Sequence, residues 1–328
     1  MSNLEQEINQ FNKTFNLIKD EIGKVIVGNQ EVVSNTLSAI MAGGHVLLEG
    51  VPGLGKTLLV NSIANSLGLK FKRIQFTPDL MPSDITGTEV LTETNNGKEF
   101  QFVEGPIFAN IILADEINRA TPKTQSSLLE AMEEKQITVL GKTHKLEKPF
   151  FVLATQNPVE LEGTYPLPEA QLDRFMIKLL LDLPSESELK EILNRTTGSS
   201  IPKSADVFGD QNSNQIIEEM KELVRKVVLP DPLQEVLVRM LSALNPSSKF
   251  ATDKAKKYLR YGPGPRGAQA TVLFAKVQSL LAGRINVDFN DLKKALTPCL
   301  RHRLVLNFQA EAEGIASDQL ITEVLNAK

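Results

Sequence analysis

The sequence is poor in the features that mark several large classes of protein. It has one cysteine, Cys299, and three widely spaced histidines, so it cannot form an internal disulfide and shows no cluster of zinc ligands. Its apolar runs are far shorter than the ~20 residues of a membrane span. The net charge of -4 gives no general attraction to nucleic acid or anionic lipid. These absences favour a soluble cytoplasmic protein that neither inserts into a membrane nor binds nucleic acid.

What the sequence does contain is the composition of an ordinary globular protein. Hydrophobic residues make up 41% and charged residues 23% of the 328 positions, which favours a folded chain, and the length suggests two domains. The first 24 residues lack the apolar stretch of a secretory signal. Their apolar positions recur every three or four residues, which predicts one amphipathic helix. These positions are Leu4, Ile8, Phe11, Phe15, Ile18 and Ile22.

Short β-rich runs alternate with helical segments in the first half of the chain, a pattern typical of a parallel sheet covered by helices. The β-rich runs are 45–49, 71–76, 111–114, 150–155 and 176–181. After residue 184 the spacing becomes helical and no convincing strand is present. The helical segments there are 186–195, 214–229, 232–244, 252–260, 267–282 and 289–297. We therefore predict a three-layer αβα domain over 1–184 and a smaller all-α domain over 185–328.

Two connecting segments stand out from this pattern. Residues 136–146 form two β-rich stretches around Gly141-Lys142, which predicts a hairpin inserted before the strand at 150. Residues 196–214 are polar and contain Gly, Ser and Pro, so we expect an exposed loop there.

A complete phosphate-binding loop follows the first β-rich run and precedes a helical segment. Its glycines allow several backbone N–H groups to converge on phosphate oxygens. Lys56 supplies a positive charge to the β- and γ-phosphates, Thr57 offers a hydroxyl to Mg²⁺, and the following helix adds its N-terminal dipole. ATP and Mg²⁺ are the predicted ligands. The predicted nucleotide contacts are Gly50, Pro52, Gly53, Leu54, Gly55, Lys56, Thr57 and Leu58.

An acidic pair ends the apolar run 111–114 and supplies what hydrolysis needs. Asp115 is predicted to hold Mg²⁺ through its water shell, together with Thr57. Glu116 is predicted to orient and polarise the attacking water. Because neighbouring strand residues point in opposite directions, the two carboxylates should have different tasks.

The sequence resembles the MoxR family of AAA+ ATPases from about residue 27 to residue 302. The resemblance rests on several motifs in the right order and at compatible spacings. They are GGHVLLEGVPGLGKT at 43–57, RIQFTPDLMPSDITG at 73–87, ILADEINRATPKTQSSLLEAMEE at 112–134, ATQNP at 154–158 and LPEAQLDRF at 167–175.

The resemblance implies further catalytic residues. Asn157 would lie near the γ-phosphate and the attacking water, because its strand would lie between those of the phosphate loop and Asp115. Arg174, in LDRF, would be an arginine finger sent into the neighbouring subunit. The alternative role for Arg174 is an ion pair with Asp173 or Glu169 within the same chain.

The resemblance also assigns residues outside the sheet. Arg266, in YGPGPRG at 261–267, would be the lid arginine that reaches back to the nucleotide; the family often has serine where this chain has Gly264. The formal GxGxxG match of this stretch is rejected, because no strand precedes it and two prolines interrupt it. Val27-Gly28 resembles the segment beside the adenine, with a glycine between helices as the simpler explanation.

Two insertions are expected to face the pore of a ring. Residues 75–87 resemble an extra helix after the second strand, and with the 136–146 hairpin they would push on a partner or remain solvated insertions. Arg119 would either bridge to an adjacent subunit or cap local carboxylates.

The function implied is that of an ATP-hydrolysing subunit in a homo-oligomeric ring, a hexamer. The resemblance implies chaperone-like maturation of protein complexes, often with a partner that carries a von Willebrand factor A domain. Three alternatives remain open. They are a DNA-acting AAA+ motor, a small-molecule P-loop kinase and a nucleotide-gated scaffold with little turnover.

Overall fold

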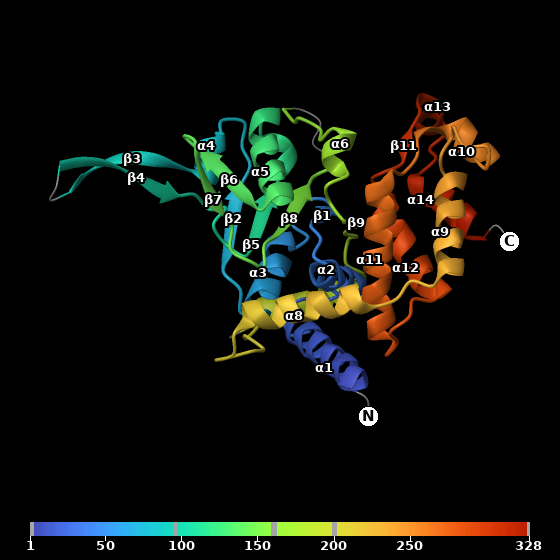
Figure 1. Cartoon of the computed structure of the whole chain (residues 1–328), viewed down its shortest axis with the longest axis horizontal. Coiled ribbons are helices and arrows are strands. Elements are labelled where there is room, and N and C mark those ends of the chain that lie inside the picture. The colour runs from blue at the N-terminus through green and yellow to red at the C-terminus, as the bar shows by residue number, and fades with distance from the viewer. Residues whose placement is uncertain (1–2, 95–96, 159–162, 199–201, 327–328) are drawn as a thin grey trace.

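A parallel five-stranded sheet lies at the centre of the chain (Figure 1). The computed structural model describes residues 3–94, 97–158, 163–198 and 202–326. The strand order is β2-β5-β8-β1-β9, so β8 separates the phosphate-loop strand β1 from β5. All neighbouring pairs are parallel. The strands are β1 (Val46–Glu49), β2 (Phe71–Gln75), β5 (Ile111–Asp115), β8 (Phe151–Gln156) and β9 (Ile177–Leu180). The predicted runs all form strands.

Side chains alternate between two cores, one on each face of the sheet. Val46 and Leu48 belong to one core, whereas Leu47 belongs to the other. Helices α1 (Asn3–Gly23), α2 (Gln30–Met41) and α3 (Lys56–Ser66) contribute to the first core, and α5 (Pro122–Glu134) contributes to the second. The three-layer αβα architecture is therefore confirmed.

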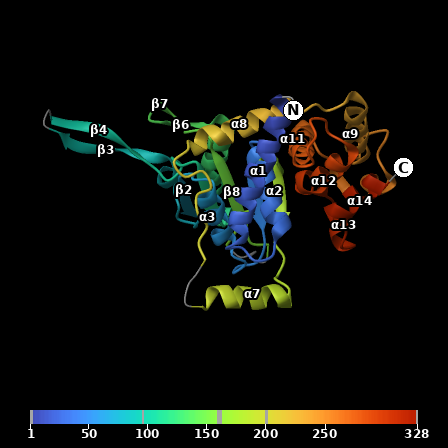
Figure 2. The same ribbon diagram turned by 90° about the horizontal axis from the view of Figure 1, so that it is seen from below.

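Helix α1 belongs to the first core. All but the first of its predicted apolar positions are buried, and the helix packs against α2, α3 and α11 (Pro265–Leu281), as can be followed in Figure 2. Burying each large apolar side chain stabilises the fold by about 1.5–3 kcal/mol. The periodicity of the sequence predicted this helix correctly.

Two hairpins project from the sheet domain, and only one was predicted. The expected hairpin is formed by β6 (Gln136–Val139) and β7 (Lys142–Lys145). The short helix α4 (Pro82–Thr86) leads into a longer hairpin of β3 (Gly87–Thr94) and β4 (Gly97–Glu104), which extends away from the body in Figure 1. Gly87 has φ 91°, and an added Cβ would lie 2.2 Å from the Val103 carbonyl oxygen, so a side chain is excluded there. The Asn-Gly pair at 96–97 is typical of a two-residue hairpin turn, and it was the sequence feature from which this longer hairpin could have been predicted.

The C-terminal segments are helical as predicted, with one correction. The helices are α7 (Glu186–Thr196), α8 (Ser213–Lys226), α9 (Asp231–Ala243), α10 (Asp253–Tyr258), α11, α12 (Phe289–Leu300), α13 (Phe308–Ala312) and α14 (Ser317–Asn326). The expectation of no strand is wrong, because β10 (Leu259–Tyr261) pairs antiparallel with β11 (Val305–Leu306). Strands of two or three residues are too short to give a periodic pattern, and their pairing depends on distant segments.

The C-terminal helices pack against the sheet domain at several places. Helices α8 and α11 contact α2, and α12 contacts β9. The loop before α8 is less exposed than expected, since Phe208 is buried in the first core. The domain boundary at residue 184 stays a prediction. No helix among the described residues is long and apolar enough to cross a membrane.

Candidate active site

The phosphate loop connects the carboxyl end of β1 to the first turn of α3. Gly53 and Gly55 have positive φ values of 85° and 73°, conformations that side-chain-bearing residues rarely adopt. A Cβ built on either glycine would meet no atom within 4 Å, so the loop leaves open space on that side. Gly50, by contrast, packs closely against Leu181 and Leu54. The loop is therefore anchored at its start and open where the backbone turns.

Lys56 and Thr57 begin α3 and point to the polar groups around the loop. The Lys56 ammonium donates a hydrogen bond to the Gly50 carbonyl at 2.6 Å. Burial lowers the pKa of Lys56, while the carboxylates of Asp115 and Glu116 oppose that shift. The Thr57 hydroxyl lies 3.5 Å from Asp115 Oδ2. Hydroxyl and carboxylate oxygens are the hard ligands that Mg²⁺ prefers, so this pair fits a magnesium site.

Asp115 ends β5 and is held by side chains from both neighbouring strands. Arg73, on the neighbouring strand β2, places Nη2 at 2.6 Å and Nε at 3.0 Å from Asp115 Oδ2. The Thr155 hydroxyl donates to Asp115 Oδ1 at 2.6 Å. Asp115 is buried, and these bonds orient its carboxylate toward Thr57.

Glu116 takes its direction from a left-handed turn. Its φ and ψ are 56° and 51°, an uncommon conformation for a residue other than glycine. The Glu116 N–H donates to Thr155 Oγ1 at 2.8 Å, and its carboxylate accepts from Gln75 Nε2 at 2.8 Å. Arg119 Nη1 lies 3.2 Å from the same Oε2 atom, so Arg119 caps a local carboxylate. The two acidic residues do have different partners, but the turn, and not strand alternation, separates them.

Asn157 directly follows β8, between the strands that carry the phosphate loop and the acidic pair. Its side chain is buried, with 5% of its surface exposed. Because the carboxyl ends of parallel strands meet at one edge of the sheet, Asn157 lies at the same edge as Lys56, Asp115 and Glu116. Its catalytic role stays a prediction.

Arg174 and Arg266 lie together at the opposite end of the sheet. They line a cavity of about 240 Å³ with His45 and Met176, the residues that immediately precede β1 and β9. The phosphate loop follows the other end of β1, whose four residues alone span about 13 Å. The structure therefore does not bring Arg266 to the phosphate loop of its own subunit.

Both arginines contact one carboxylate. Arg174 Nη1 lies 2.8 Å from Glu133 Oε2 and donates to the Leu129 carbonyl at 2.6 Å. Arg266 Nη2 contacts the other oxygen of Glu133. Arg174 thus pairs with Glu133, and not with the neighbours in sequence that were the alternative partners.

Val27 and Gly28 form part of the connection between α1 and α2, and α7 lies against it. Gly28 has φ 68°, and a Cβ there would lie 2.3 Å from Glu188 Oε1 on α7. Arg195, also on α7, donates to the carbonyls of Gly23 and Lys24 at 3.0 and 2.8 Å. Contact with adenine at this segment stays a prediction.

Sequence reasoning missed four polar residues of these sites. Arg73 and Gln75 lie two positions apart on the same face of β2 and reach Asp115 and Glu116 across the β2–β5 pairing. Thr155 and Glu133 are the other two. The period of two along β2 was a usable signal for the first pair, whereas nothing local marks Glu133.

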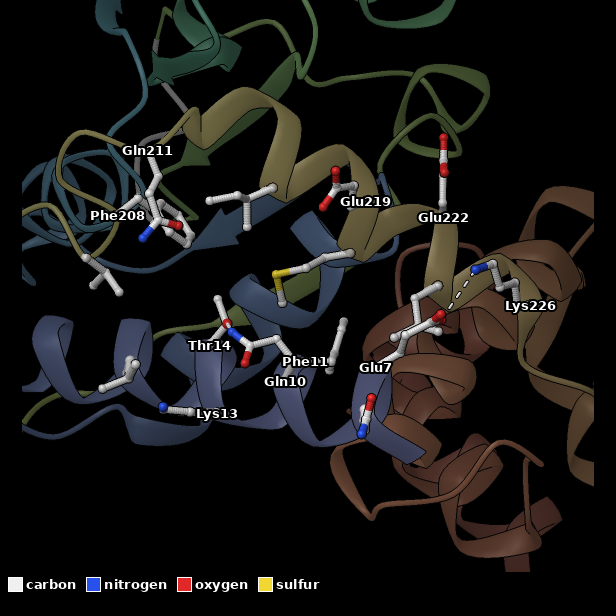
Figure 3. Close-up of a pocket in the computed structure, with 16 residues that line it drawn as sticks. Glu7, Gln10, Phe11, Lys13, Thr14, Phe208, Gln211, Glu219, Glu222 and Lys226 are labelled. Atoms are coloured by element: carbon white, nitrogen blue, oxygen red, sulfur yellow. Dashed lines mark hydrogen bonds and ion pairs between the residues drawn. The ribbon is translucent and has the colours of Figure 1, made fainter. Parts of the chain in front are cut away.

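A wide hollow lies away from both groups of residues. It measures about 740 Å³ and lies between α1 and α8, as Figure 3 shows. Phe11, Phe208 and Met220 line it and also belong to the first core, while Lys226 and Glu7 form an ion pair across it at 3.4 Å. We assign no ligand to this hollow between α1 and α8.

The fold and the first site define a class of protein. A phosphate loop after one parallel strand, with an acidic pair two strands away in the same sheet, is the arrangement of P-loop nucleotide hydrolases. Comparison with known proteins agrees. Residues 45–177 match the model of the ATPase family associated with various cellular activities (AAA), and residues 252–324 match the AAA lid domain.

Individual relatives identify the family within this class of nucleotide hydrolases. The chain is 42% identical to the uncharacterized protein YeaC of Bacillus subtilis over 94% of this chain and 92% of that protein. It is 39% identical to Chaperone MoxR1 of Mycobacterium tuberculosis over 93% of this chain and 79% of that one. A crystal structure of a candidate ATPase from Cytophaga hutchinsonii superposes with a TM-score of 0.89 at 40% identity, covering 98% of this chain and 96% of its own. The chain belongs to the MoxR family of AAA+ ATPases, and its reaction is the hydrolysis of ATP.

Proposed function

We propose that the chain works as one subunit of a cytoplasmic homo-oligomeric ring, a hexamer, that uses ATP hydrolysis to remodel protein complexes. The observation that carries the proposal is the separation of the phosphate loop from Arg174 and Arg266 at opposite ends of one sheet. A guanidinium suits the charge that develops on a transferring phosphoryl group. Neither arginine can serve the loop of its own chain, so each would serve a neighbour.

Each residue of the first site has a task in this proposal. The loop glycines with Lys56 hold the phosphates, and Thr57 with Asp115 would hold Mg²⁺, which supplies positive charge to the β- and γ-phosphates. Glu116 accepts a proton from the attacking water, and Asn157 positions that water. Gln75 and Arg119 keep the Glu116 carboxylate in place.

We propose that ATP hydrolysis drives a mechanical change that acts on a bound protein. The AAA lid region packs against β9 through α12, so a change at the nucleotide would alter the contact between lid and sheet. The relative named Chaperone MoxR1 supports a chaperone-like role. The proposed client, which the family resemblance implies, is a protein with a von Willebrand factor A domain. DNA-stimulated hydrolysis would favour a DNA-acting motor instead.

The substitution Glu116→Gln tests the central assignment. It keeps the hydrogen-bonding shape but removes the base, so ATP binding should persist while phosphate release falls by at least about a hundredfold. Nucleotide binding is measured by calorimetry and turnover by phosphate release, with Glu130→Gln on α5 as a control outside the site. Undiminished turnover would remove the role given to Glu116. Affinity purification of the same variant with ATP should retain the protein client.

A further inference from the structure

A chain of five charged side chains lies at the amino end of β1 and β9. Glu133 is in the last turn of α5, Asp173 and Arg174 follow α6 (Glu169–Leu172), Arg266 is in the first turn of α11, and Arg303 follows α12. Three guanidinium groups alternate with two carboxylates in the order Arg174, Glu133, Arg266, Asp173, Arg303. The network therefore joins the sheet domain to the C-terminal helices and keeps one excess positive charge.

The Arg303 end of this network is fixed in the protein interior. The Arg303 side chain is 3% exposed, and its Nε lies 2.7 Å from Asp173 Oδ1. Arg303 also donates to the carbonyls of Met176 and Phe175 at 3.0 and 2.8 Å. Such a buried and fully bonded guanidinium is a structural anchor, not a group that can reach another subunit.

The Glu133 end is half exposed and could contact a neighbouring subunit. The side chains of Glu133, Arg174 and Arg266 are 40%, 29% and 43% exposed. Each oxygen of Glu133 contacts a different arginine, so one carboxylate sets the separation of two guanidinium groups from different parts of the fold. Asp173 is 4.0 Å from Arg266, a weaker second contact.

This bridge matters for catalysis because arginine side chains are long and mobile. Holding one arginine side chain in place costs about 2 kcal/mol of rotamer entropy. The ion pairs with Glu133 already restrain both arginines within the subunit, before the neighbouring subunit binds. A misplacement of about 1 Å at a reacting group can reduce the rate by a factor of about a hundred. Exposed ion pairs add little stability by themselves, so the value of the bridge lies in geometry.

We propose that Glu133 is a positioning residue that presents Arg174 and Arg266 as one unit to the nucleotide of the neighbouring subunit. The inference rests on the proposed function, in which both arginines act across the subunit interface. Glu133 does not touch the nucleotide of its own subunit, because it lies at the opposite end of the sheet from the phosphate loop. The defect of a Glu133 variant therefore belongs to the subunit that donates the arginines.

The first test compares Glu133→Ala and Glu133→Gln with Glu134→Gln, which alters the next residue of the same helix. We expect kcat to fall about tenfold or more in Glu133→Ala and less in Glu133→Gln, because an amide oxygen can still accept from one arginine. KM for ATP should change less than twofold, and Glu134→Gln should match the wild type. Wild-type or higher kcat in Glu133→Ala would overturn the proposal, the higher value indicating that Glu133 masks the arginines.

The second test decides where the defect acts. Glu133→Ala subunits, whose phosphate loop is intact, are mixed with Lys56→Ala subunits, whose arginines and Glu133 are intact. Turnover should rise above the sum of the separate proteins, because a Lys56→Ala neighbour supplies a positioned arginine pair. No gain at any mixing ratio would place the defect within its own subunit or in its folding, and would overturn the proposal.

Arg174→Ala separates failure of this inference from failure of the proposed function. Loss of turnover in Arg174→Ala, restored by mixing with Lys56→Ala, supports action across the interface whatever Glu133 does. If that holds while Glu133→Ala is normal, only the role of Glu133 is wrong. If Arg174→Ala keeps full turnover, the interface role itself is wrong and the inference about Glu133 is wrong with it.

Discussion

At the scale of single residues, one hydroxyl joins the two acidic groups of the site. Thr155 Oγ1 donates to Asp115 Oδ1 and accepts from the N–H of Glu116, so it fixes a carboxylate and a left-handed turn together. Thr155 is completely buried, and water cannot replace these bonds. The placement of Glu116 therefore depends on a residue from a neighbouring strand.

Thr155→Val tests this dependence. The substitution keeps the shape but leaves the Glu116 N–H unpaired, which should lower the free energy of unfolding by about 1–3 kcal/mol. Turnover should fall more than ATP affinity, because the turn that directs Glu116 is loosened. Thr155→Ser, which retains the hydroxyl, is the control in urea denaturation and phosphate-release assays. Equal behaviour of the valine and serine variants would contradict the assignment.

A second residue-scale prediction concerns acid stability. His45 is buried between α5 and β8, where it contacts the Met132 carbonyl and accepts from the Val152 N–H, and burial lowers its pKa to about 4 from 6.5. The unfolded chain therefore binds the proton more tightly, and stability falls as pH decreases from 6.5 toward 4. The loss is on the order of 3 kcal/mol.

Urea denaturation at pH 7 and pH 5 measures this slope. His45→Gln should be less stable at pH 7 but should show a smaller loss on acidification. A slope remains in the variant, because burial also lowers the pKa of His302. An unchanged pH dependence in His45→Gln would mean that His45 does not titrate in this range.

At the scale of elements, the two projecting hairpins hold each other. The Phe102 ring on β4 stacks on His144 of β7, with ring centroids 3.9 Å apart. Lys142 of β7 lies 2.8 Å from Glu89 of β3. Apolar side chains such as Leu91 and Phe100 remain exposed farther along the longer hairpin. The two hairpins therefore form one connected arm.

Hydrogen exchange tests this connection. An aromatic pair contributes about 0.5–1.5 kcal/mol, so His144→Ala should speed amide exchange at the base of β3–β4 by up to about tenfold. Amides of β5 and β8 should not change, because those strands are buried in the central sheet. Lys145→Ala, an exposed change on the same strand, is the control. Unaltered exchange in the long hairpin would show that the hairpins are independent.

At the scale of the whole molecule, the phosphate loop and the arginine pair lie at opposite edges of the central sheet. The phosphate loop lies at the carboxyl edge of the sheet and the arginine pair at the amino edge. In the proposed function a single subunit is therefore incomplete, and repetition of the same contact around a closed ring would complete every site.

Dilution tests that prediction. Turnover per subunit should fall steeply below the concentration at which subunits associate, whereas ATP binding per subunit should persist because Lys56 and Thr57 are local to each chain. Light scattering follows assembly in parallel with phosphate release. Turnover per subunit that stays constant down to the monomer would contradict a composite site.

The sequence by itself determined the nucleotide chemistry and the layer architecture. The phosphate loop and acidic pair are contiguous residues, and the strands and helices have local periodicities, so both are readable without tertiary contacts. The order of strands that the family resemblance implied, with β8 between β1 and β5, also agrees with the structure.

Only the tertiary structure decided which distant residues meet. Thr155 reaches Asp115 from 40 positions away in the sequence. Glu133 bridges Arg174 to Arg266, which lies 133 positions after Glu133, and β10 pairs with β11. Each of these contacts depends on chain segments brought together by the core, and no local pattern encodes them. The family resemblance likewise implied that Arg266 contacts the nucleotide of its own subunit. The fold instead places Arg266 beside Arg174 at the opposite end of the sheet, and we propose that it acts on the nucleotide of the next subunit.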